Sequence, residues 1–121
     1  MLTLSHGLNL LILLPLLTAF LFTPESMTPA FGPDTNARRI LVCLYATIAV
    51  ASMVSLALLA TGYTETGRHI SVTLFALQIV YKSLTVLFIG FGSSVVVTNG
   101  VVVLVHSTTL LTLYLSRHTV A

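Results

Sequence analysis

Charged side chains are scarce in this sequence. Asp, Glu, Lys and Arg make up 7% of its 121 residues, whereas an ordinary soluble domain carries about 25%. So few charges cannot cover the surface of a folded protein in water, but a lipid bilayer is itself apolar and needs no such cover. Hydrophobic residues make up 56% of the chain, and the mean hydropathy is +1.05. Composition therefore predicts an integral membrane protein that crosses the bilayer several times.

Two other scarcities narrow the range of partners. Cys43 is the only cysteine, so no disulfide can form within the chain and the redox compartment is left open. Basic residues are few and too scattered to form the clustered face that binds nucleic acid. They are Arg38, Arg39, Arg68, Lys82 and Arg117. We therefore expect membrane lipids as partners and no nucleic acid.

Catalytic signatures are missing as well. The sequence has no phosphate-binding loop, no CxxC pair and no nucleophile elbow. Glu25, Asp34 and Glu65 are the only acidic residues and fall between the apolar runs, which disfavours a proton channel or a cation-coupled exporter built on a membrane carboxylate. No two histidines have the i, i+4 spacing of a zinc or di-iron site. We expect a protein without catalytic residues and without a metal site.

Four apolar runs are each long enough to cross a bilayer, for which about 20 residues are needed. They predict helices over residues 2–22, 37–61, 69–90 and 94–116, and a proline-rich loop over residues 23–36. The fourth helix has two candidate starts, Ser94 or Thr98-Asn99, because the second also looks like an N-cap. Pro29 should prevent anything longer than one short turn in the loop. The predicted fold class is all-α, a single-domain transmembrane four-helix bundle with up-down topology.

The second predicted helix is rich in small residues, which let membrane helices approach one another closely. These residues are Ala46, Ala49, Ala51, Ser52, Ser55, Ala57 and Ala60. We expect this helix at the centre of the bundle or at an interface with a partner.

The orientation in the membrane stays open. Lys and Arg near helix ends favour the cytoplasmic side. An up-down bundle places Arg68 and Arg117 on one side and Arg38 and Arg39 on the other. The rule therefore gives a tie.

Lys82 is the most informative residue, because it lies near the middle of the third predicted helix. A lysine there costs about 2.5–3.5 kcal/mol on insertion scales and marks a candidate functional site. Ser71, Gln78, Lys82 and Thr85 are spaced by seven, four and three residues, so they share one face that should avoid lipid. Four roles are open to the amine: a neutral form, snorkelling to the headgroups, an anionic lipid or ligand, and a group on another subunit.

His106 is the second candidate, near the centre of the fourth predicted helix and on one face with Asn99 and Thr109. A membrane histidine can ligate haem or a chlorophyll-type pigment, move protons, or simply form a hydrogen bond. Because the third and fourth helices should be antiparallel neighbours, we predict an intramembrane polar cluster that binds a ligand or partner. Its members would be Lys82, His106, Gln78, Tyr81 and Asn99.

Two pairs of polar residues lie near predicted helix ends. Arg38 and Arg39 are expected beside the membrane surface, where they would contact lipid headgroups or serve as ordinary interfacial anchors. His6 and Asn9 are three residues apart on the first helix and are expected near an interface.

One resemblance is carried by the first half of the chain. The segments 21–24 (Leu-Phe-Thr-Pro) and 31–33 (Phe-Gly-Pro), followed by Arg38-Arg39 and the Ala/Ser-rich helix, resemble DoxX-like and uncharacterised small four-helix integral membrane proteins. The resemblance implies a compact four-helix bundle and, through the DoxX name, a link to quinone-coupled oxidoreductase partners. No catalytic residue is carried over from it.

Two functions are expected on these grounds. The first is a non-catalytic accessory or structural subunit of a larger membrane complex of respiratory or photosynthetic type, in contact with other membrane subunits or with copies of itself. The alternative is a stand-alone small transporter or ligand-binding bundle that uses Lys82 and His106. Buried polar groups without internal partners would favour the first, and a continuous cavity that reaches Lys82 would favour the second.

Overall fold

A computed structural model describes the backbone of residues 1–119 and the side chains of residues 1–116, so the Arg117 side chain lies outside the described part. The described chain is almost entirely helical and has no strand. Its elements are α1 (Leu2–Phe22), a 3-10 turn η1 (Pro24–Met27), α2 (Thr28–Phe31), α3 (Asn36–Ala60), α4 (Thr64–Ile89) and α5 (Ser94–Thr119). The predicted all-α four-helix bundle is confirmed.

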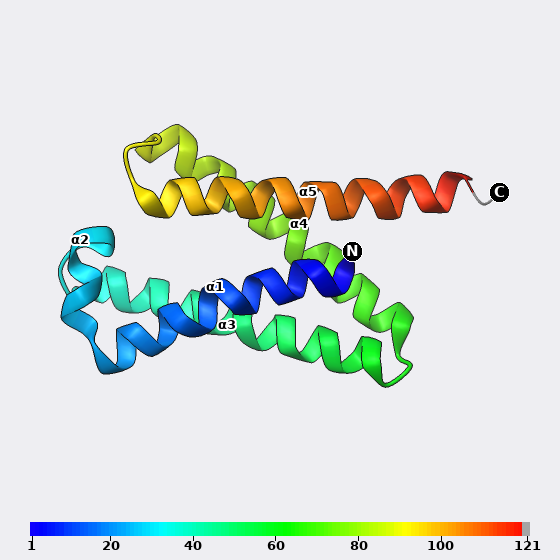
Figure 1. The fold of residues 1–121 in the computed structure, drawn as a ribbon, viewed down its shortest axis with the longest axis horizontal. Helices are drawn as coiled ribbons and strands as arrows, with labels where there is room; N and C mark the ends of the chain where they lie inside the picture. Colours follow the sequence, from blue (N-terminus) through cyan, green and yellow to red (C-terminus); the bar gives the residue numbers. More distant parts are fainter. Residues whose placement is uncertain (120–121) are drawn as a thin grey trace.

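Consecutive long helices run antiparallel and pack side by side. α3 packs on α1, α4 on α3, and α5 on α4, whereas α1 and α5 meet over a shorter stretch. Figure 1 shows the N-terminus, the α3–α4 turn and the end of α5 at one end of the bundle, with α2 and the α4–α5 turn at the other. The weak contact between α1 and α5 leaves room near the α2 end, and the candidate site lies there.

The bundle is apolar outside and polar inside. Its four long helices are long and apolar enough to cross a membrane. Among the described residues, twelve polar or charged side chains are buried but only eight apolar ones. The buried polar residues are Ser5, His6, Asn9, Arg38, Ser52, Ser55, Ser71, Gln78, Lys82, Asn99, His106 and Thr109. Large apolar side chains instead cover the outside, such as Leu11, Leu77 and Leu104, which are 62–72% exposed.

The predicted starts of the first, second and fourth long helices are correct within one residue, but the predicted start of the third is wrong. α4 begins at Thr64 rather than at residue 69, because the polar segment expected to be a link forms the first turns of the helix. Glu65 accepts a hydrogen bond from Arg68 one turn later, at 2.7 Å, and an acidic residue suits a helix N-terminus. The real link is only Thr61–Tyr63, where Gly62 takes a φ of +92° that a side chain would disfavour. α5 begins at Ser94, the first of the two candidate starts.

The prediction that Pro29 stops the loop after one turn is wrong. The turn Pro24–Met27 is followed directly by the four-residue helix α2, and Pro29 is its second residue. Proline is tolerated there because a backbone N–H in the first turn of a helix has no partner within that helix. The loop is therefore a compact double turn that covers one end of the bundle.

Arg38 holds this double turn together. Its guanidinium donates to the backbone carbonyls of Gly32 and Pro24, each at 2.7 Å, and lies 5.3 Å from the centre of the Phe20 ring. The residue is only 6% exposed. Its charge is thus committed to the loop, and it does not face outward as the predicted headgroup contact requires.

Arg39 points the other way. It donates two hydrogen bonds of 3.1 Å to the Asp34 carboxylate on the exposed surface. These bonds lower the pKa of Asp34 below its ordinary value, so the ion pair persists at neutral pH and is lost as the pH falls through that lowered pKa. Of the two arginines, only Arg39 has its side chain on the exposed surface.

Replacing Arg38 by methionine should destabilise the protein, whereas Arg39→Met should hardly change it. The first variant leaves two loop carbonyls without a donor, and we expect a loss of about 2–3 kcal/mol in the free energy of unfolding. Arg39→Met removes the same charge from the neighbouring position but only breaks an exposed ion pair. Thermal unfolding of both variants in detergent checks this. Equal losses in the two would contradict the role assigned to Arg38.

Candidate functional site

The side-chain amide of Asn9 joins all four long helices. Its Nδ2 donates to Ser52 Oγ of α3 at 3.1 Å and to Gln78 Oε1 of α4 at 2.9 Å. Its Oδ1 accepts from Gln78 Nε2 at 3.2 Å and from His106 Nε2 of α5 at 3.0 Å. Both N–H groups of the Asn9 amide and both lone pairs of its oxygen are therefore engaged. Because Oδ1 can only accept, His106 carries its proton on Nε2.

A second polar layer lies next to the first, toward the N-terminus of α1. His6 Nε2 and Ser71 Oγ are 2.7 Å apart, and Ser5 bonds to Thr109. The Phe75 ring packs against both imidazoles, at centroid distances of 4.6 Å to His6 and 4.3 Å to His106. Polar pairs and one aromatic ring therefore fill this half of the bundle.

Lys82 belongs to a separate layer nearer to α2. Its Nζ donates to Asn99 Oδ1 at 2.9 Å and lies 5.0 Å from the centre of the Tyr81 ring. Asn99 Nδ2 donates in turn to Thr85 Oγ1 at 3.3 Å. Lys82 is 5% exposed. Since an ammonium has three N–H donors, the single hydrogen bond to Asn99 leaves two of them unused.

The five residues predicted to form one cluster are divided between the layer around Asn9 and the layer around Lys82. Gln78 and His106 meet through Asn9, whereas Lys82 contacts Asn99 and Tyr81. The Lys82 amine and the His106 imidazole bond to different partners. Sequence reasoning gave no role inside the bundle to Asn9, His6 or Ser5. The available signal was their spacing, because Asn9 lies one turn before Leu13 on the face of α1 that also buries Phe20.

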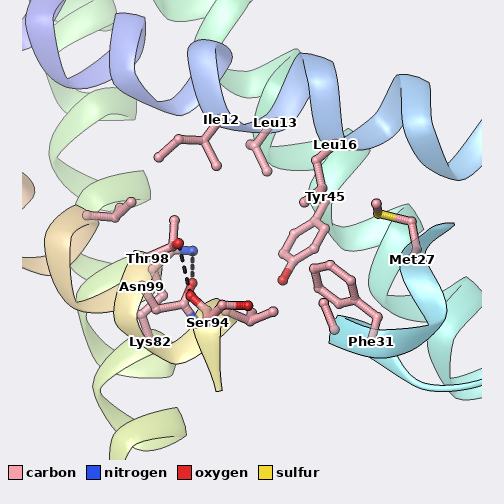
Figure 2. Close-up of a pocket in the computed structure, with 13 residues that line it drawn as sticks. Ile12, Leu13, Leu16, Met27, Phe31, Tyr45, Lys82, Ser94, Thr98 and Asn99 are labelled. Atoms are coloured by element: carbon pink, nitrogen blue, oxygen red, sulfur yellow. Dashed lines mark hydrogen bonds between the residues drawn. The ribbon is translucent and has the colours of Figure 1, made fainter. Parts of the chain in front are cut away.

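A cavity of about 250 Å³ lies beside Lys82. Figure 2 shows Ile12, Leu13 and Leu16 of α1 on one side of this space and Lys82 with Asn99 on the other. The hydroxyl group of Tyr45 points into the space from α3 (Figure 2). The lining is thus largely apolar, with one amine, one amide and one phenol directed inward.

A larger cavity of about 800 Å³ adjoins the first. The two share lining residues from α2, α3 and α5, which are Ala30, Phe31, Tyr45, Ser94, Val95 and Asn99. Tyr81 lines the second cavity, and its buried hydroxyl has no hydrogen-bond partner. Leu44 and Ile89, also in the lining, are 43% and 63% exposed. The second cavity therefore reaches the apolar outer surface between α3 and the end of α4.

No side-chain carboxylate balances the charge of Lys82. Glu25, Asp34 and Glu65 are all exposed and lie in the loop or in the first turn of α4. Asp34 pairs with Arg39, and Glu65 with Arg68. These are all the acidic side chains in the sequence, so no side-chain carboxylate of this chain serves as a counter-ion for Lys82.

The site at His106 does not fit a haem or a pigment. The ring is fully buried, is stacked on Phe75 at 19° and bonds through Nε2 to Asn9. Neither of the cavities beside Lys82 has His106 in its lining. A ligand bond through Nε2 would break the hydrogen bond that ties α5 to α1, and Nδ1, which has no partner, is buried. Among the described residues, no three His, Cys, Asp or Glu side chains cluster as a metal site.

No protein family, no curated protein and no solved structure matches this chain. The resemblance to DoxX-like proteins therefore stays a prediction. Function has to be argued from the cavities and the residues around Lys82.

Proposed function

We propose that this chain is a multi-pass integral membrane protein that binds a small anionic amphiphile in the cavity beside Lys82. The membrane part of the proposal is supported by the four long apolar helices and by the inverted polarity. In water the polar residues would cover the surface, but in lipid they are most stable when they bond to one another inside.

One observation carries the ligand part: a cavity opens onto a buried amine that has unused donors and no side-chain counter-ion. Charges attract more strongly in an apolar interior than in water, so an anion in this cavity would gain a strong interaction with the amine. Asn99 engages one N–H of the amine, and both residues line the cavity. The apolar wall from α1 suits a hydrocarbon group, which makes the preferred ligand amphipathic.

Binding is favoured over catalysis by the rest of the lining. Ser94 and Thr98 are the hydroxyl-bearing side chains of α5 in the first cavity, and neither bonds to a histidine or a carboxylate that would activate it. The hydrogen-bond partner of Lys82 is the neutral side-chain amide of Asn99, which can act neither as a general acid nor as a general base. The cavity is therefore suited to holding a molecule.

The polar interior does not test the accessory-subunit prediction. Gln78 and Asn99 find partners inside the bundle, whereas the hydroxyls of Ser55 and Tyr81 and the Nδ1 atoms of His6 and His106 are buried without one. The broad apolar surface is equally suited to lipid and to neighbouring subunits. We place ligand binding first because of the cavity beside Lys82, and keep the accessory role as a prediction.

Native mass spectrometry from a non-ionic detergent tests the proposal with ten-carbon amphiphiles that carry sulfonate, carboxylate or trimethylammonium heads. We expect saturable binding of one anionic molecule, no binding of the cation, and a loss of affinity of about 10- to 100-fold in Lys82→Met. Arg39→Met is the matched control, because it removes a positive charge from the same end of the bundle but outside the cavity. Equal binding by wild type and Lys82→Met would refute the proposal.

A further inference from the structure

The depth of Lys82 restricts the ligands that can reach it. Lys82 precedes Ile89, the last residue of α4, by seven residues, which places it about 10 Å along the axis from that helix end. A head group that binds the amine must therefore leave the bilayer surface. Phosphate and sulfonate groups keep their charge at neutral pH, but a carboxylic acid can move through an apolar layer in its protonated, uncharged form.

We propose that the ligand is a free long-chain carboxylate whose head binds Lys82 and Tyr81 and whose tail leaves sideways through the larger cavity. This inference rests on the proposed function and names its substrate class. A carboxylate carries one negative charge, and the two cavities offer one cation, Lys82, in their described lining. A phosphate monoester carries close to two charges at neutral pH and would remain half uncompensated.

The unused donors match the acceptors of a carboxylate. Its two oxygens provide about four lone-pair sites. Lys82 has two free N–H groups, and Tyr81, whose ring lies against the amine, has a buried hydroxyl with no partner. A buried hydroxyl without a partner costs free energy in the empty protein. A ligand oxygen would remove that cost, which makes Tyr81 the second donor to the head group.

The larger cavity provides the path for a tail. It adjoins the first cavity at Tyr45 and Asn99, and Leu41, Leu44 and Ile89 give it apolar walls that continue to the outer surface. A chain too long for the space beside Lys82 can therefore extend into the surrounding hydrocarbon. Affinity should rise with chain length until the tail reaches the opening and should then level off.

The experiment compares sixteen-carbon and eight-carbon ligands in native mass spectrometry, with the head groups carboxylate, sulfonate and phosphate. We expect the long carboxylate to bind at least tenfold more tightly than the other two heads. Tyr81→Phe, which removes no hydrogen bond of the empty protein, should weaken the carboxylate about 5- to 10-fold. Leu44→Trp, at the opening, should weaken the long chain and spare the short one.

Each outcome separates the two proposals. If sulfonate and carboxylate bind equally and both depend on Lys82, the carboxylate inference is overturned while the proposed function stands. If no head group depends on Lys82, both are overturned. If Tyr81→Phe binds as wild type does, Tyr81 is not a donor to the head group. Palmitate is the sixteen-carbon carboxylate. If phosphatidylserine displaces it in lipid nanodiscs, the carboxylate that binds Lys82 belongs to a lipid head group, and the proposal of a free acid is overturned.

Discussion

Replacing Asn9 by leucine is expected to lower the free energy of unfolding by about 2–4 kcal/mol. Leucine has the same branched shape but removes the amide that bonds α1 to α3, α4 and α5. Gln78 loses both of its amide contacts, and His106 loses the acceptor of its Nε2 proton. Hydrogen bonds between membrane helices average only about 0.6 kcal/mol each, so the expected effect comes from orphaning several groups together.

Two serines of α3 provide a matched control for this prediction. Ser52 and Ser55 are both fully buried on the same helix, but Ser52 accepts from Asn9 whereas Ser55 Oγ has no partner. Ser52→Ala should therefore be destabilising, and Ser55→Ala neutral or slightly stabilising. Unfolding by an ionic detergent, followed by circular dichroism, compares all three variants. If Asn9→Leu unfolds at the same detergent concentration as wild type, the amide of Asn9 does not stabilise the bundle.

The four long helices could be predicted from the sequence because the length and apolarity of a run determine whether it can cross a membrane. Continuous apolar runs predicted four spans, and three of their starts are correct within one residue. The error at α4 has a physical reason: residues 64–68 are polar, but polar residues can form a helical turn as readily as a link. The error at Pro29 has a similar origin, because a proline that ends one turn can begin another.

The faces of the helices were also readable. Ser71, Gln78 and Lys82 are buried on one side of α4, as their spacing predicted, and Asn99, His106 and Thr109 are buried on α5. What the sequence could not supply was the relative height of the helices. Gln78 and Lys82 are one turn apart, and a shift of α1 by one turn would bring Asn9 opposite either of them. Helix height follows from packing across the whole bundle.

The cavity was beyond prediction for a related reason. It depends on how far α1 lies from α5 and on where the double turn places Phe31. That turn is held by Arg38, whose sequence context beside Arg39 gave both the same expected role. Neighbouring residues on a helix point about 100° apart, so one arginine faces the loop and the other the surface.

Removing the Lys82 amine is expected to stabilise the empty protein while weakening ligand binding. Lysine at the centre of a membrane helix costs about 2.5–3.5 kcal/mol on insertion scales. This is an upper bound for Lys82, which lies seven residues before the end of α4, and one hydrogen bond to Asn99 offsets part of the cost. The double variant Lys82→Met/Asn99→Leu removes both partners, so neither is left unsatisfied. We expect it to be more stable than wild type by about 1–3 kcal/mol when no ligand is present.

Ligand should reverse this order, which separates a functional lysine from a structural one. At a ligand concentration one hundred times the Kd of wild type, binding stabilises the native wild-type protein by about 2.7 kcal/mol, whereas the double variant, which binds more weakly, gains less. Unfolding midpoints measured with and without a long-chain carboxylate should therefore cross. A double variant that is less stable than wild type without ligand would mean that Lys82 holds the bundle together through Asn99. The amine would then need no ligand, and the reason to place one in the cavity would be gone.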